Sequence, residues 1–332
     1  MAGMSTGNSA NLIRAQLWST QLKDVLYADL QARGYVRWLS EFPDGTTFNI
    51  PSIGTMTSND YIEDSSIQYT ALDTGNFQFS INNYVSTGTY ITNKAKQDSM
   101  YMDMVVGMFV PKMSRAIEER LEGDIFKEGQ PKTGAPAGYQ LPNVDNKING
   151  FAHRWVGGQT VNSVQTLGPA DFAKANLALD KAFVPRTNRI AIVDPTVAYN
   201  LETQTNLVNV SYNPMWQGVI ETGLSTGLRF SRNVYGFDVY VSHFLPKSGV
   251  DGGGASETIN TVASGANARC NLFFSATTDL LPWIGAWRQM PKVETDYNKD
   301  FQREEYVTTA RYGLKIYRPE NLVTVLSNTA IV

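Results

Sequence analysis

The alternation of apolar and polar positions separates two segments at the start of the chain. From residue 12 to residue 39, apolar side chains recur at helical spacing, which predicts an N-terminal arm with one or two short helices. From Gly45 to Asn93 the pattern changes to a strict alternation, clearest over residues 84–90. That alternation is typical of strands, so we expect a long two-stranded excursion here.

A long helix is predicted from Lys94 to Gly123, where apolar positions again follow a helical period. Met100, Met104 and Met108 are spaced four residues apart, which places them on one face. We interpret this stripe as a packing face, because methionine commonly fills irregular cores. Pro111 should kink or divide the helix, since proline removes a backbone donor and clashes with the preceding turn.

The rest of the chain mixes helices, strands and loops. Two segments rich in small and turn-forming residues, 129–166 and 247–268, predict loops or short irregular strands. The expected helices cover 168–183 and 195–202, and the expected strands cover 188–195, 235–242, 271–276, 305–318 and 322–326. This order predicts a core of the α+β class.

Composition sharpens this picture through its low charge. Charged residues make up 18% of the 332 residues, against about 25% in a typical globular protein. The net charge of −3 excludes a basic chain that binds nucleic acid mainly by neutralising phosphates. A weakly charged polar surface loses little solvation energy when a partner covers it. The length suggests about two domains.

The predicted two-stranded excursion has an uneven distribution of charge. No Lys, Arg or His lies between Leu39 and Asn93, whereas six acids do: Glu41, Asp44, Asp60, Glu63, Asp64 and Asp73. One interpretation is an acidic, solvated hairpin. The other is an acidic arm that lies on a basic part of another subunit, which we consider because an isolated hairpin is only marginally stable in water.

Candidate catalytic chemistry is limited to one motif. Gly223-Leu224-Ser225-Thr226-Gly227 matches the nucleophile elbow of serine hydrolases. The acid and base that chain order offers are Asp238 and His243, but on one predicted strand they point to opposite faces. We therefore expect no catalytic residues, and keep a hydrolase using Ser225 only as a remote alternative.

Metal and cofactor sites are not expected. The chain has two histidines and one cysteine, Cys270, which excludes an intramolecular disulfide and a four-cysteine zinc site. His153 is interpreted as structural. Asp60, Glu63 and Asp64 lack the glycine-centred spacing of a calcium loop, and no phosphate-binding glycine motif is present.

Targeting and membrane segments are likewise not expected. No stretch approaches the ~18 apolar residues of a membrane span. The small, polar start of the chain does not resemble a secretory signal, so we expect synthesis in the cytoplasm and no membrane partner.

Taken in order, these segments resemble the tailed-bacteriophage major capsid protein family over nearly the whole chain. The resemblance rests on the order of the segments and on two loose motifs, Gly236-Phe237-Asp238-Val239 and Tyr312-Gly313-Leu314-Lys315-Ile316-Tyr317-Arg318-Pro319. It implies an α+β phage capsid fold divided into an N-terminal arm (1–43), an extended β-hairpin loop (44–93), a spine helix with the peripheral domain (94–160), an axial domain (161–285) with a glycine-rich surface loop near 247–268, and a return to the peripheral domain (286–332).

The resemblance also implies a function. Members of this family assemble into the hexamers and pentamers of an icosahedral head that encloses double-stranded DNA without reading its sequence. Their partners are further copies, a scaffolding protein, a portal and, in some members, cement proteins. The protein would then be assembled in the host bacterial cytoplasm and located in the virion.

Within this interpretation the hairpin would lie across a neighbouring subunit. Its acids, Asp60, Glu63, Asp64 and Asp73 among them, would meet bases such as Arg288, Lys292, Arg303, Arg311 and Lys315. Some members join neighbours through a lysine on this loop, but residues 24–93 contain no lysine, so we expect a shell without such crosslinks. An encapsulin-type compartment shell on the same fold stays open as an alternative.

Overall fold

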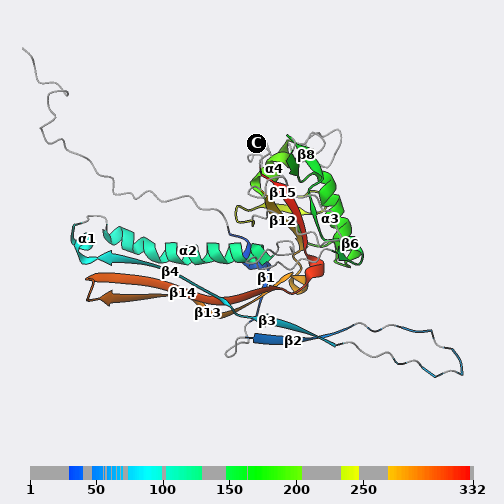
Figure 1. Ribbon diagram of the computed structural model, residues 1–332, viewed down its shortest axis with the longest axis horizontal. Coiled ribbons are helices and arrows are strands. Elements are labelled where there is room, and N and C mark those ends of the chain that lie inside the picture. The colour runs from blue at the N-terminus through cyan, green and yellow to red at the C-terminus, as the bar shows by residue number, and fades with distance from the viewer. Residues whose placement is uncertain are drawn as a thin grey trace, which may run out of the picture.

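The computed structural model describes residues 30–39, 47–98 apart from 55, 57, 61, 65, 68 and 70–73, 102–128, 147–203 apart from 163, 233–246 and 268–329. These residues form an elongated layer of one helix on one sheet, a second body around another sheet, and a projecting two-stranded hairpin (Figure 1). The structure therefore has the mixed α+β character that the sequence predicted.

The elongated layer is a four-stranded sheet in the order β1-β13-β14-β4. Its strands are β1 (Val36–Leu39), β4 (Asn83–Thr92), β13 (Trp283–Asn298) and β14 (Arg303–Ile316). β1 runs parallel to β13, and the other neighbours are antiparallel. The long helix α2 (Met102–Glu128) lies along one face of this sheet, where Phe109 contacts Tyr306 edge to face (Figure 1).

One prediction about the long helix was wrong. The helix does not end at Gly123 but continues to Glu128, because the side chains of Ile125 and Phe126 are still fully buried in the core. Of the kink or division expected at Pro111, the division does not occur, since one helix runs through the proline between partly buried Phe109 and buried Met113. A short helix, α1 (Asn93–Asp98), precedes α2.

The second body surrounds a five-stranded sheet in the order β11-β10-β12-β15-β7. These strands are β7 (Arg154–Val156), β10 (Arg189–Val193), β11 (Asp238–Val241), β12 (Ala268–Ser275) and β15 (Val323–Asn328). The helices α3 (Pro169–Lys181) and α4 (Pro195–Glu202) pack against this sheet, and α4 begins where the Asp194 carboxylate caps Thr196 N. Edge-to-face contacts among Phe172, Phe237 and Phe273 occupy the centre of the core.

The last strand has an unexpected partner. The family resemblance grouped residues 322–326 with the strand over 305–318. In the structure β15 pairs instead with β12 and β7, in the other sheet. The pairing is favoured because every residue of β15 is buried, which requires a place inside a sheet covered on both faces.

The short elements are two hairpin strand pairs and turns of 3-10 helix. The small strands are β5 (Lys147–Ile148), β6 (Phe151–Ala152), β8 (Gln159–Val161) and β9 (Val164–Thr166). The 3-10 turns are η1 (Ala32–Tyr35), η4 (Thr278–Leu280) and η5 (Pro319–Asn321). Within the described ranges, no helix combines the length and apolar character needed to cross a membrane.

The projecting hairpin is shorter than predicted. β2 (Thr47–Ile53) pairs antiparallel with β3 (Thr74–Ser80), and together they form the hairpin. The sequence placed residues up to Asn93 in the same excursion, but β4 is a strand of the four-stranded sheet and pairs with β14. Alternation alone does not reveal which partner a strand takes, because any half-buried strand shows it.

Candidate subunit interface

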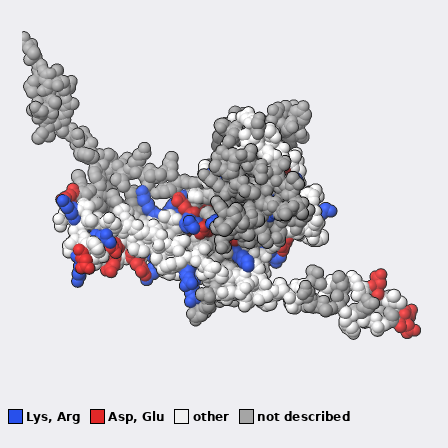
Figure 2. All heavy atoms as spheres, viewed as in Figure 1, with Lys and Arg blue, Asp and Glu red and all other residues white. Residues whose placement is uncertain are grey.

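The hairpin exposes apolar side chains that a compact domain would bury. Tyr69 is 93% exposed and Met56 75%, and the other large apolar residues between the strands or at their ends are similarly open: Ile53, Ile62 and Ile67. Asp60, Glu63 and Asp64 are exposed in the same segment. Figure 2 shows these acids at the far end of the hairpin, away from the basic side chains of the main body. Glu41, Asp44 and Asp73 lie outside the described residues.

The root of the hairpin is attached to its own sheet. Lys315 Nζ donates to Gln78 O at 2.6 Å, and the Phe77 ring contacts Tyr317 with a centroid distance of 5.3 Å. Gly313 permits this approach, because a Cβ there would lie 2.7 Å from Ser80 O. Lys315, expected to meet a neighbour's acids, is thus engaged within its own chain.

The other predicted bases lie on one sheet. Arg288 and Lys292 are exposed on β13, and Arg303 and Arg311 are half-buried on the adjacent β14. Tyr306 and Tyr312 of β14 contact α2, so the odd-numbered residues of that strand, including Arg303 and Arg311, face away from the helix. Lys292 is the partner of Thr309, which puts it on the same side.

These residues define what we call the open face, the side of the four-stranded sheet opposite α2. Its members include Tyr84, Tyr90, Lys292, Arg303, Val307 and Arg311, placed by strand alternation and register, and the same register places Glu294, Asp296 and Glu305 on it. Tyr84 is 63% exposed and Tyr90 57%. The open face therefore offers aromatic area and three basic side chains, with three acids among them.

Two of the bases have weak partners in their own chain. Arg303 donates to Glu305 at 2.6 Å and stacks on Tyr90, with 4.4 Å between its guanidinium carbon and the ring centre. The hydrogen bond from Arg303 lowers the pKa of Glu305. Lys292 is 3.2 Å from Glu294, and both side chains are largely exposed. The exposed Lys292–Glu294 pair stabilises the fold by roughly 0–1 kcal/mol, so it exchanges readily for an intersubunit partner.

The residues considered for catalysis do not come together in the described part of the chain. Ser225 and its motif lie outside the described residues. Asp238 accepts a hydrogen bond from Asn233 at 3.2 Å, and His243 is exposed beyond the end of β11. His153 is fully buried, with Nδ1 3.2 Å from Leu322 O. No group of three or more His, Cys, Asp or Glu residues that could hold a metal occurs among the described residues.

Sequence reasoning missed a buried carboxylate at the root of the N-terminal arm. Glu122 of α2 is 2% exposed and accepts hydrogen bonds from Gln31 N and Ala32 N, each at 2.9 Å. Burial raises its pKa, and the two backbone hydrogen bonds oppose that rise. Arg33 adds an ion pair to Glu118 at 2.6 Å. The helix thereby fixes where the arm enters the fold.

Comparisons with known proteins agree with this architecture. A family model described as phage capsid protein matches residues 80–325. The chain therefore belongs to the phage capsid protein family, a family of structural proteins of the virion shell, as the sequence predicted. No curated protein sequence matches it.

Solved structures show the same fold at low identity. The cyanophage Pam1 capsid asymmetric unit is 16% identical with a TM-score of 0.66, and the match covers 99% of this chain and 100% of that one. Mycobacterium phage Che8 is 15% identical with a TM-score of 0.64, covering 95% and 97%. The mature capsid of bacteriophage PhiM1 is 13% identical with a TM-score of 0.66, covering 97% and 94%. The predicted phage capsid fold is confirmed.

Proposed function

We propose that this protein is the major subunit of a tailed-phage head, in which copies form hexamers and pentamers around double-stranded DNA. The observation that carries the proposal is the hairpin. Its large apolar residues are exposed, Tyr69 at 93%, although burying such residues is what stabilises a fold. A shell in which every subunit is bordered by copies supplies the missing contacts.

We further propose that the hairpin lies on the open face of a neighbouring copy. The hairpin has exposed acids at Asp60, Glu63 and Asp64, and the open face has Lys292, Arg303 and Arg311. On assembly Lys292 and Arg303 would exchange their partners Glu294 and Glu305 for acids of the hairpin. Both surfaces also offer aromatic side chains for burial, such as Tyr69 and Tyr90. Complementary charge orients such a contact, while the apolar area supplies most of its free energy.

Electron microscopy of the purified protein, alone and with a scaffolding protein, tests the proposal. We expect capsomers, tubes or shells in at least one preparation. Finding only unassembled subunits in both would contradict it. Mature particles on denaturing gels should run as single subunits, because residues 24–93 contain no lysine for a crosslink; a ladder of covalent multimers would refute that part.

Neutralising the hairpin acids tests the contact itself. The triple variant Asp60→Asn, Glu63→Gln, Asp64→Asn should fold normally and raise the concentration needed for assembly, most clearly at low salt, where exposed charges are least screened. The matched control makes the same charge change at exposed sites outside the hairpin: Asp98→Asn, Glu202→Gln and Asp279→Asn. Equal effects of the two triples would argue against a specific role for the hairpin.

The resemblance to the family extends the proposal to partners and to the absence of catalysis. A scaffolding protein, a portal and cement proteins are the expected partners, and the division into peripheral and axial domains stays a prediction. The protein is proposed not to be an enzyme. Any esterase activity of the purified protein that Ser225→Ala abolished would overturn this point.

A further inference from the structure

The end of α3 displays an aromatic residue in a backbone conformation that aromatic residues avoid. Phe183 is 87% exposed and has a φ of 61°. The helix ends at this residue, and a hydrogen bond from Val184 N to Leu179 O, 3.0 Å long, spans the turn that contains it. Glycine or asparagine usually occupies this position, because a Cβ in the left-handed region crowds the backbone. A bulky side chain here therefore costs folding energy without any burial to offset it within the subunit.

A second exposed aromatic residue shares this conformation. Tyr235 is 57% exposed, has a φ of 50° and precedes Gly236 in the tight turn between Val234 and Phe237. Such turns favour Asn-Gly. Of the other non-glycine residues with positive φ in the described part of the chain, four are Asp or Asn, which tolerate it, and one is Gln: Asp64, Asn149, Asn162, Asn188 and Gln302. Phe183 and Tyr235 are thus the aromatic exceptions.

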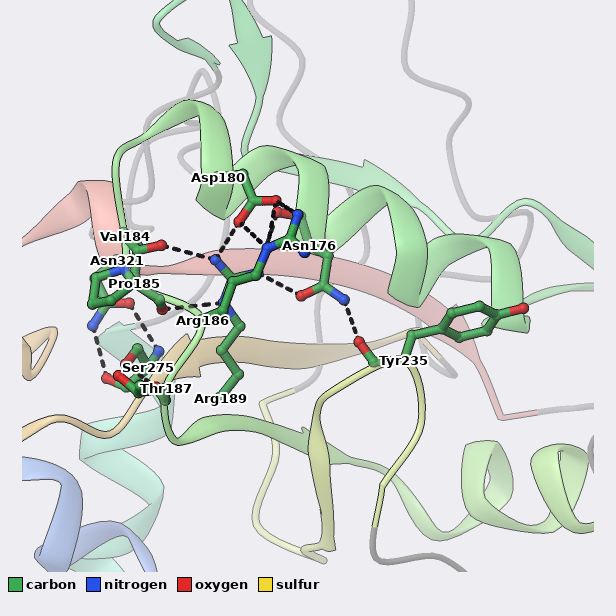
Figure 3. Close-up of polar contacts among 10 residues, drawn as sticks. All are labelled: Asn176, Asp180, Val184, Pro185, Arg186, Thr187, Arg189, Tyr235, Ser275 and Asn321. Atoms are coloured by element: carbon green, nitrogen blue, oxygen red, sulfur yellow. Dashed lines mark hydrogen bonds and ion pairs between the residues drawn. The ribbon is translucent and has the colours of Figure 1, made fainter. Parts of the chain in front are cut away.

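One polar network holds both turns in place (Figure 3). The Arg189 side chain, 1% exposed, donates to Asp180 and to Asn176 Oδ1 at 2.6 Å each, and to Val184 O at 2.8 Å. Asn176 in turn donates from Nδ2 to Tyr235 O. The turn after α3 and the turn at Tyr235 are therefore fixed to the same helix. Groups held rigidly before binding lose little conformational entropy when they bind.

The charged side chain beside Phe183 is also held in place. Arg186 is largely exposed, but its guanidinium donates three hydrogen bonds to the Asp180 carboxylate that it shares with Arg189, the shortest at 2.6 Å. A paired charge resists burial less than a lone one. The turn that carries Phe183 thus presents aromatic area beside a guanidinium held in a fixed ion pair, and aromatic residues and arginine are both enriched at protein interfaces.

We propose that Phe183 and Tyr235 are rigid anchors of an interface with a second copy of this chain, an inference that rests on the proposed assembly. A copy is the occupant because the chain belongs to the phage capsid protein family and the proposed function is a shell built from many copies. The strained backbone is retained because the aromatic side chains gain contacts on assembly that they lack in the subunit.

The substitution Phe183→Gly separates folding from assembly. Glycine relieves the strained φ, so the melting temperature of the unassembled subunit should stay the same or rise. Removal of an interface anchor should raise the critical concentration for assembly about tenfold or more. Phe183→Tyr keeps an aromatic ring and should assemble like the parent. Tyr235→Asn should act in the same direction with a smaller effect.

The matched control is Leu177→Ala, which removes a 45% exposed apolar side chain from the same helix. It should assemble like the parent. If Phe183→Gly assembled at the same concentration as the parent, the inference would be overturned and the proposed function would stay intact. Normal assembly of Phe183→Gly with lost binding of a scaffolding or cement protein would also overturn it, because the occupant would not be a copy. Failure of the parent chain to assemble would contradict both proposals.

Discussion

The hairpin and the five-stranded sheet use similar residues in opposite ways. Every residue of β10 and β15 is buried, whereas Ile53 at the end of β2 is 73% exposed and Tyr69 beyond it 93%. The sheet completes its core with α3 and α4 from its own chain. The hairpin contacts its own sheet at its root, where Lys315 binds Gln78 O and Phe77 packs on Tyr317. One region is stabilised by folding, and we infer that the other is stabilised by assembly.

Polar groups follow the same division. In the sheet, Asn271 is fully buried and satisfied: its Oδ1 accepts from Asp194 N at 2.9 Å and its Nδ2 donates to Val325 O at 3.0 Å. On the hairpin, the acids Asp60, Glu63 and Asp64 are exposed. Buried polar groups must find partners within the fold, whereas exposed ones stay available to a partner that arrives later.

The largest expected effect comes from a substitution that disrupts the core around the five-stranded sheet and leaves the hairpin intact. Phe172→Ala removes a fully buried ring that contacts Phe237 and Phe273, and should lower the free energy of unfolding by about 4 kcal/mol. Tyr69→Ala, on the hairpin, should change it by less than about 0.5 kcal/mol but weaken assembly. Urea unfolding and an assembly assay measure the two quantities. A large loss of subunit stability in Tyr69→Ala would contradict the distinction between a sheet stabilised by folding and a hairpin stabilised by assembly.

The next largest effect is expected from a substitution in the polar network that joins α3 to Arg189. Asp180→Asn leaves the buried Arg189 guanidinium without its carboxylate, which should cost about 3 kcal/mol. Hydrogen bonds from Arg186 and Arg189 lower the pKa of Asp180, so its stabilising effect is present above its ordinary value of 3.8 and is lost as the pH falls through the lowered value. The stability difference between parent and variant should therefore shrink in acid. A difference that stayed constant would contradict this role.

A third effect tests the root of the hairpin. Gly313→Ala places a Cβ 2.7 Å from Ser80 O and 2.9 Å from Ile81 Cα, so the strand must move, at a cost of about 2 kcal/mol. Gly123→Ala is the control, because nothing lies within 4 Å of its Cβ and alanine favours a helix. It should stabilise slightly. Thermal unfolding distinguishes the two, and equal melting temperatures would mean that the root is not packed as described.

The smallest effect concerns the carboxylate that holds the arm. Burial raises the pKa of Glu122 above its ordinary value of 4.5. The folded state therefore favours the protonated form, and the associated stability is present below 4.5 and lost as the pH rises through the raised value. Parent stability should fall relative to Glu122→Gln over that interval in urea unfolding. If the free energies of unfolding of the parent and of Glu122→Gln changed with pH in parallel, Glu122 would have the same pKa in the folded and unfolded states.

The sequence predicted elements better than their partners. Alternation over residues 84–90 identified a strand, but not that β4 pairs with β14, where Thr92 is opposite Arg303 more than 200 positions away. The helical period identified α2, yet not its continuation past Gly123, which depends on Ile125 and Phe126 reaching a core built from distant strands. Long-range packing decides these features, and the local pattern of apolar and polar residues does not reveal it.

The candidate interface shows the same limit. The acids and bases could be identified from charge alone, and the structure places Lys292, Arg303 and Arg311 on one face. Phe183 offered no signal, because an aromatic residue at the end of a helical pattern suggests a core position. Its exposure and its φ of 61° are visible only in the folded chain.

A charge exchange between the hairpin and the open face tests the central claim most directly. Asp60→Lys, Glu63→Lys and Asp64→Lys form one variant, and Lys292→Glu, Arg303→Glu and Arg311→Glu form the other. Each should fold and fail to assemble at the concentration where the parent forms shells, and the chain that carries all six changes should assemble again. Normal assembly of either triple variant, or no recovery in the combined chain, would contradict a hairpin that is completed by its neighbour's sheet.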